Sequence, residues 1–100
     1  MNHDLKTLPE FFEAVKCGDK MFECRRNDRG FQKSDTVTLK KFNPKAVVLI
    51  HQQAISGYMR NGYSEAKPLV REITYVLTGE EWGIKDGYAV LGLKEIEAAK

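Results

Sequence analysis

The sequence lacks a hydrophobic run long enough to cross a bilayer and lacks any cluster of metal-binding side chains. Its longest apolar run, AVVLI at 46–50, is far shorter than the roughly 20 residues that a transmembrane helix needs. The first residues, MNHDLKTLPEFF, are polar and include early acids, which is not typical of a signal peptide. We therefore expect a cytoplasmic protein with no membrane partner.

Cysteine and histidine are also scarce. Two cysteines, Cys17 and Cys24, and two histidines make neither a zinc signature nor a disulfide framework. We expect two reduced thiols, no metal site and no cofactor. The charge is nearly balanced, with 16 basic and 14 acidic residues and a formal net charge of +2. Any nucleic-acid site must therefore come from local clustering of cations rather than from overall charge.

The composition that remains is that of an ordinary globular domain. The chain has 100 residues, of which 42% are hydrophobic and 30% charged. Domains most often contain about 100–150 residues, so we expect residues 1–100 to form a single domain with one small core.

A helix is predicted at about 8–17. Thr7 is placed as its N-cap and Glu10 follows at capping-box spacing, while Pro9 falls in the first turn, where proline is tolerated. Gly18 is a natural C-terminal stop.

Strands are predicted on both sides of a turn at NDRG. In KMFECRR, period-2 alternation predicts that Phe22 and Cys24 face inward and that Glu23 and Arg25 share the other face. In DTVTLKKF, the same alternation buries Val37 and Leu39. Two later strands follow, LVREITYVLTG and YAVLGLKEI. In the first of these, the candidates for burial are Val70, Ile73, Tyr75 and Leu77.

The segment 43–68 is ambiguous. Asn43 as N-cap and Pro44 at the first helical position favour a helix over about 44–59. The β-branched content of AVVLI equally suits a strand. RNGYSEAKP is predicted to be a loop. One helix followed by several strands indicates an α+β fold with a small mixed sheet or barrel.

The charged segment at 20–26 is the main candidate for a functional site. Glu23 and Arg25 project from one face and can pair, and Lys20, Arg25 and Arg26 offer cations to phosphate. Glu23 could accept a hydrogen bond from a base edge. The alternative interpretation is an exposed strand face whose ion pairs partly cancel, each worth about 0–1 kcal/mol.

The octet GDKMFECR fits G-x-K-x-x-E-x-R, and it resembles the signature of the ASCH domain, a branch of the PUA-like superfamily. HDLKTLPEFFEAVKCGDKMFECRRNDRGFQKSDTVTLKKF and REITYVLTG…GIKDGYAVLGL resemble a small bacterial and phage family catalogued as domain of unknown function 3850. The resemblance implies a PUA-like, ASCH-type β-barrel of about five strands flanked by helices. It also marks 43–68 as an insertion, because the family joins its central strands by a short turn.

The resemblance also implies function. Related PUA-like domains bind RNA, and one ASCH-like group deacetylates 4-acetylcytidine with a lysine, a threonine and a glutamate. By position the lysine is Lys20, but the threonine position holds Glu23, so the nucleophile is missing. Glu80 or Glu81 is a candidate for the third member.

Three hypotheses follow. The leading one is an RNA- or nucleotide-binding module that uses a basic cleft around the octet. Its predicted binding residues are Lys6, Lys20, Glu23, Arg25, Arg26, Asp28 and Arg29. The second is a hydrolase of a modified base or nucleoside, with Lys20 and Glu23 as catalytic candidates, although the missing threonine argues against an enzyme. The third is a phage-type protein-interaction domain whose apolar segment 43–59 packs against a second copy, forming a homo-oligomer, or against a host partner.

Overall fold

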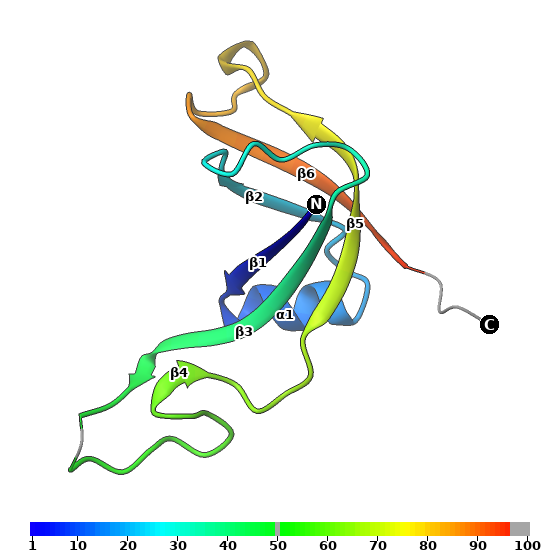
Figure 1. Cartoon of the computed structure of the whole chain (residues 1–100). Helices are drawn as coiled ribbons and strands as arrows, with labels where there is room; N and C mark the ends of the chain where they lie inside the picture. Colours follow the sequence, from blue (N-terminus) through cyan, green and yellow to red (C-terminus); the bar gives the residue numbers. More distant parts are fainter. Residues whose placement is uncertain (50, 97–100) are drawn as a thin grey trace.

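The described part of the chain forms a curved β-sheet with one α-helix packed against it (Figure 1). The computed structural model describes residues 1–49 and 51–96. The elements in chain order are β1 (Asn2–Thr7), α1 (Pro9–Lys16), β2 (Phe22–Arg26), β3 (Thr36–Val47), β4 (Asn61–Tyr63), β5 (Leu69–Leu77), the short 3₁₀ helix η1 (Glu80–Trp82) and β6 (Tyr88–Glu95).

The strands form one sheet in the order β1-β3-β5-β6-β2, and β4 pairs with β3 beside this path. β1 runs parallel to β3, and every other pairing is antiparallel. β1 and β2 are the two ends of this order, and no main-chain pairing joins them. The structure is mostly sheet, so the predicted class is confirmed only in the broader sense of α+β or mostly β. The expected barrel is wrong in that the sheet is open, and α1 is the only α-helix among the residues described.

The core lies between α1 and the inner face of the sheet. Its fully buried large side chains are Leu5, Phe12, Val37, Leu39, Ile73 and Leu91. The predicted burial of Val37 and Leu39 is confirmed. An isolated helix as short as α1 is not stable in water. Burial of apolar surface, which contributes roughly 25 cal/mol of free energy per Å², holds it on the sheet.

The predicted helix is confirmed, but its predicted cap is wrong. α1 begins at Pro9, its N-cap is Leu8, and no side chain bonds to the cap. Thr7 instead ends β1, opposite Lys41 of β3, and its side chain is buried. Pairing with β3 therefore fixes Thr7 as a strand residue, and Leu8 takes the N-cap position instead. Gly18 follows the helix with φ +88°, a left-handed conformation that glycine adopts without strain.

The predicted inner and outer faces of β2 are reversed. Glu23 is 4% exposed, whereas Phe22 is 47% exposed and Cys24 is also exposed. β2 is an edge strand that faces β1 across the open side of the sheet, and two cations cover the Glu23 carboxylate. Alternation was correctly predicted, but a strand's own pattern does not reveal that ion pairs can bury its charged face.

The predicted helix at 44–59 is wrong. β3 continues through this segment to Val47 and pairs with β4, with Phe42 opposite Tyr63 and Val47 opposite Asn61. We call residues 42–66 the arm, which projects away from the body of the sheet (Figure 1). The radius of gyration is 15.1 Å, against about 13 Å for a compact chain of this length. Ile50 lies outside the described residues.

The two C-terminal strands are confirmed as β5 and β6, and β6 has an interior position between β5 and β2. Of the four β5 side chains predicted to be buried, only Ile73 is fully buried; Val70 and Tyr75 are exposed. A register shift between Ile73 and Tyr75 interrupts the alternation and turns Tyr75 outward. In the part of the chain that the structure describes, no helix has the length and apolar character needed to span a membrane.

Candidate functional site: a cleft between the two edge strands

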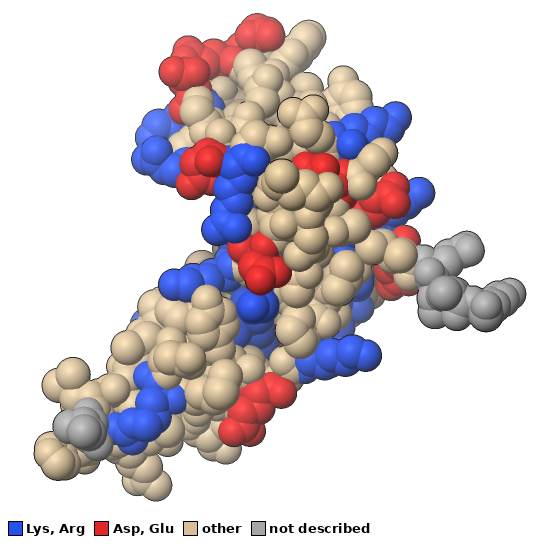
Figure 2. Space-filling view, viewed as in Figure 1, with Lys and Arg blue, Asp and Glu red and all other residues tan. Residues whose placement is uncertain are grey.

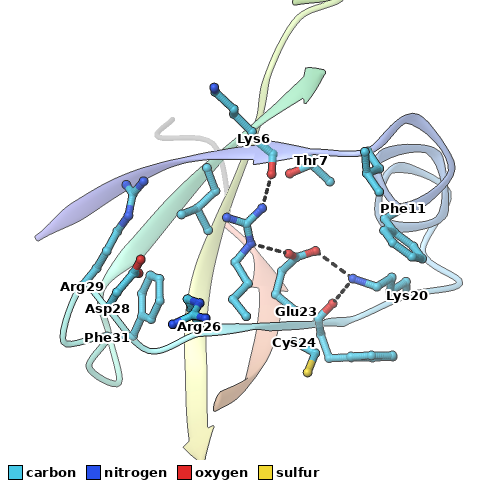
Figure 3. A pocket seen from close by; sticks show the side chains of 14 residues that line it. Lys6, Thr7, Phe11, Lys20, Glu23, Cys24, Arg26, Asp28, Arg29 and Phe31 are labelled. Carbon is cyan, nitrogen blue, oxygen red and sulfur yellow. Dashed lines mark hydrogen bonds and ion pairs between the residues drawn. The ribbon is translucent and has the colours of Figure 1, made fainter. Parts of the chain in front are cut away.

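A cleft of about 490 Å³ lies on the open side of the sheet. One wall comes from β1 and the start of α1, and the other from Lys20, β2 and the loop that follows it (Figure 3). The cleft exists because β1 and β2 are the two ends of the sheet and curve toward one another without pairing. Residues at 5–11 and 20–31 thus meet around one space, although 15 or more positions separate many of them.

An ion-paired triad lies on the β2 wall. Lys20 Nζ lies 2.7 Å from Glu23 Oε1, and Arg25 Nε lies 3.1 Å from Glu23 Oε2 (Figure 3). Lys20 Nζ also donates a 2.7 Å hydrogen bond to the Phe22 carbonyl. Each carboxylate oxygen therefore has its own cation, and the triad keeps one net positive charge. These bonds hold both cations in one geometry, as charge-assisted hydrogen bonds do.

Two arginines span the gap between the edge strands. The Arg25 guanidinium donates to the carbonyl of Lys6, and Arg29 Nη1 donates to the carbonyl of Asp4 at 2.6 Å. These carbonyls belong to the edge of β1 that has no neighbouring strand. Because a carbonyl carries no net charge, the bond to Asp4 leaves the charge of Arg29 uncompensated, whereas Arg25 is also paired with Glu23.

The Thr7 hydroxyl is a polar group without a partner. Among the described residues, its Oγ1 is the one buried side-chain nitrogen or oxygen that has no hydrogen-bond partner. Figure 3 shows the Thr7 side chain on the cleft side of β1, facing the side where Glu23 lies. A buried polar group left unpaired costs about 1–3 kcal/mol, so a ligand that bonds to this hydroxyl would recover that cost.

Aromatic side chains flank the lysine at one end of the cleft. Phe11 of α1 is 44% exposed and Phe22 of β2 is 47% exposed, and both line the cleft. Lys20 Nζ lies 5.3 Å from the Phe11 ring centroid and 4.9 Å from that of Phe22. The Arg26 guanidinium lies 5.7 Å from the ring centroid of Tyr88, which does not itself line the cleft. Proteins that bind single-stranded nucleic acids commonly combine these groups, because bases stack on exposed rings and phosphates contact cations.

All seven predicted binding residues line this cleft. They are Lys6, Lys20, Glu23, Arg25, Arg26, Asp28 and Arg29. The structure thus brings together residues of β1, β2, the turn before β2 and the loop after it. Glu80 and Glu81 do not join them: both lie in η1 and neither lines the cleft.

The sequence analysis missed Thr7 and Phe11 as cleft residues. Thr7 was assigned a local role as a helix cap, and Phe11 was not singled out. The alternation His3, Leu5, Thr7 along β1 was the available signal, because it puts Thr7 on the same inward face as the buried Leu5.

The arm leaves the cleft open. None of the described residues of 42–66 lines the cleft. The arm instead carries exposed apolar side chains, among them Val47, Leu49, Ile55 and Met59. Self-association through 43–59 stays a prediction.

The cleft shows no sign of a metal centre: within 1–49 and 51–96 there is no group of three or more His, Cys, Asp or Glu side chains able to hold an ion. The fold and the cleft define a small open-sheet domain with a cation-rich recess between its edge strands. The chain belongs to the family described as Domain of unknown function (DUF3850), which it matches over residues 2–93. No curated protein sequence matches it.

Proposed function

We propose that the protein is a nucleic-acid-binding module, for RNA or a modified nucleotide, and that the cleft between β1 and β2 is its binding site. The resemblance of GDKMFECR to the ASCH signature supports the proposal, and membership of the PUA-like superfamily is part of it. The observation that carries it is the composition of the cleft, in which fixed cations, exposed aromatic rings and an unpartnered hydroxyl surround one space.

Each of these groups has a place in binding a nucleotide. Phe11 and Phe22 offer rings on which a base stacks, a contact worth about 1–3 kcal/mol per base. Arg26 and Arg29 offer N–H donors to phosphate oxygens. Thr7 offers a hydrogen bond to a base edge or to a ribose hydroxyl. Lys20 and Arg25 carry charge, but their bonds to Glu23 also hold the wall of the cleft in shape.

Fluorescence anisotropy with labelled RNA and DNA oligonucleotides over a range of salt concentrations tests the proposal. Arg26→Ala is the informative variant, because no hydrogen bond or ion pair of its side chain is seen in the described structure and its loss should not disturb the wall. We expect weaker binding and a log–log salt slope that falls by about 0.7 for a single strand. Lys33→Ala, outside the cleft, is the matched control. The proposal would be refuted if no nucleic acid bound the parent protein, or if the parent and Arg26→Ala bound every nucleic acid equally.

A second function is favoured by one observation. The amidohydrolase relatives use a lysine, a threonine and a glutamate, and this cleft holds Lys20, Glu23 and the unpartnered Thr7 hydroxyl. The threonine comes from β1 rather than from the octet. Hydrolysis of 4-acetylcytidine would add water across the amide C–N bond, releasing acetate and cytidine. A carboxylate near the bond is a candidate base for that water.

Mass spectrometry of 4-acetylcytidine incubated with the protein tests this second function. Release of cytidine that Thr7→Val abolishes, in a variant with unchanged unfolding, would support it. An unchanged substrate after long incubation at high protein concentration would eliminate it and leave the binding proposal standing.

A further inference from the structure

The cleft continues into two further hollows that lead toward the arm. A hollow of about 530 Å³ shares Lys6, Arg25 and Arg29 with the cleft and adds Lys40 and Tyr63. A hollow of about 380 Å³ shares Lys40 and Tyr63 with the first and adds Lys41 and Met59. We call this series of three hollows the track. Because consecutive hollows share lining residues, they lie next to one another in a series from β2, across the edge of β1, to the arm.

Strand register explains why these side chains line one path. Lys6 of β1 lies opposite Lys40 of β3, and Phe42, two positions further along β3, lies opposite Tyr63 of β4. Residues two apart in a strand share a face, so Lys40 and Phe42 lie on the same side of β3. Lys6 Nζ is 4.7 Å from the Phe42 ring centroid and 5.9 Å from that of Tyr63. Cations and rings therefore alternate from the body to the arm.

Two cations of the track, Lys40 and Arg29, remain available to a ligand. Lys40 Nζ lies 3.3 Å from the Asp4 carboxylate, but this pair is exposed on both sides, and such pairs are worth about 0–1 kcal/mol. A phosphate can therefore replace Asp4 as the partner of Lys40. Within the described residues, the one hydrogen bond of the Arg29 side chain is to a carbonyl, so its charge is not compensated there. Figure 2 shows lysine and arginine side chains along the hollowed side of the molecule, between the acidic end at the top and the arm at lower left.

We propose that the protein binds a single-stranded oligonucleotide along this track. One base lies in the cleft, phosphates lie against Arg29, Lys6 and Lys40, and a further base stacks on Tyr63. This inference rests on the proposed function and extends it from a nucleotide to a strand. Single strands suit the track because their unstacked bases can reach aromatic rings, whereas the bases of a duplex cannot. An acidic peptide would use the cations but not Tyr63.

A length series tests the proposal. Anisotropy competition with mononucleotides and with unstructured RNA and DNA of two to ten nucleotides should show affinity rising until the track is filled, at about four nucleotides or more. Lys40→Gln with Tyr63→Leu should weaken binding of an eight-nucleotide strand by about tenfold or more, since one stack alone is worth that much. Mononucleotide binding should not change.

The arm and the body supply matched controls. Lys45→Gln removes a cation from the arm outside the track, and Tyr75→Leu removes an exposed tyrosine from β5; both should leave the affinity for the eight-nucleotide strand unchanged. Lys40→Gln alone, which leaves the Phe42–Tyr63 contact intact, guards against misfolding of the double variant. It should weaken binding and lower the salt slope by about 0.7.

The outcomes separate the two proposals. Equal affinity for one nucleotide and for eight, with no effect of Lys40→Gln or Tyr63→Leu, would overturn the track and leave the cleft as the site. Failure of every nucleotide and oligonucleotide to bind would overturn both. Polyglutamate is the final competitor. If it competes as well as the eight-nucleotide strand, and if Tyr63→Leu lowers the affinity for both ligands equally little, the surface binds anions in general and the track is overturned.

Discussion

The ammonium of Lys20 lies 2.7 Å from the carboxylate of Glu23, and this contact joins the end of the α1–β2 turn to the wall of the cleft. Glu23 is buried, and Arg25 takes its second oxygen. The pair therefore belongs to the framework of the cleft as much as to its charge. Substitutions here must be judged by folding as well as by binding.

Glu23→Gln should destabilise the protein. It keeps the size of the side chain but leaves Lys20 and Arg25 without their anion, and hydrogen bonds to charged groups contribute about 1.5–3 kcal/mol. We expect the free energy of unfolding in urea to fall by about that amount. Glu13→Gln is the matched control, because its 3.4 Å contact with Lys41 is exposed on the glutamate side and should matter by about 1 kcal/mol or less. Equal unfolding midpoints for the two variants would contradict the framework role.

Arg25→Lys should loosen the two edge strands. A planar guanidinium can bond Glu23 through Nε and the Lys6 carbonyl through Nη2 at once, whereas a lysine ammonium is a single point donor. We expect faster amide hydrogen exchange in peptides covering β1 and β2. Arg71→Lys, whose nearest anion is an exposed Glu95 oxygen at 3.8 Å, should leave exchange there unchanged. If both variants exchange as the parent does, Arg25 does not hold the edges together.

Asp35 should make stability depend on acid. Its hydrogen bond with His3, at 2.9 Å, is the largest cause of a pKa lowered to about 2, and the Met1 amino group and the Gln32 amide also lower it. An ordinary aspartate has a pKa of about 3.9. Because the folded pKa is the lower one, the contribution is fully present above about pH 4 and disappears as the pH falls through 2.

Urea unfolding of the parent protein and Asp35→Asn between pH 2 and pH 6 measures this dependence. We expect the parent to lose stability from pH 4 downward and the difference between the two proteins to shrink over the same interval. A difference that stays constant across that range would show that Asp35 does not titrate as described.

Gly62→Ala should disrupt the arm. Gly62 has φ +91°, and a Cβ there would lie 2.6 Å from Phe42 Cε1 and 2.9 Å from Val47 Cγ2. A left-handed conformation costs a non-glycine residue about 1–2 kcal/mol, and the clash adds to it. Gly57→Ala, with φ +86° and no atom within 4 Å of the added carbon, isolates the backbone term. We expect hydrogen exchange across 58–64 to rise more for Gly62→Ala, and equal exchange in both variants would contradict the packing of β4 on β3.

Local signals allowed α1, β5 and β6 to be predicted. Pro9 and Gly18 bound the helix by conformations that depend on one or two residues. The arm could not be predicted in the same way, because Asn43 and Pro44 resemble a helix start. Residues 44–47 form a strand because β3 pairs with β4, where Val47 lies opposite Asn61. A local pattern of residues does not indicate a partner strand this far along the chain.

The site shows the same division. Lys20, Glu23 and Arg25 could be predicted as site residues from the octet, because all three belong to one short segment. Thr7 joins them only because sheet order brings β1 and β2 to the two sides of one gap, which no spacing in the sequence encodes. The burial of Glu23 likewise depends on its ion pairs with Lys20 and Arg25. Period-2 alternation therefore predicted the strand correctly but predicted the wrong face to be buried.

The central claim, that nucleic acid binds in the cleft between β1 and β2, is tested most directly by an amide NMR titration of the labelled protein with a short single-stranded RNA. The account predicts chemical-shift changes concentrated at Thr7, Glu23 and Arg26, with little change at Trp82 of η1, which does not line the cleft. Shifts confined to η1 or the exposed face of β5, or no shifts at saturating RNA, would contradict it.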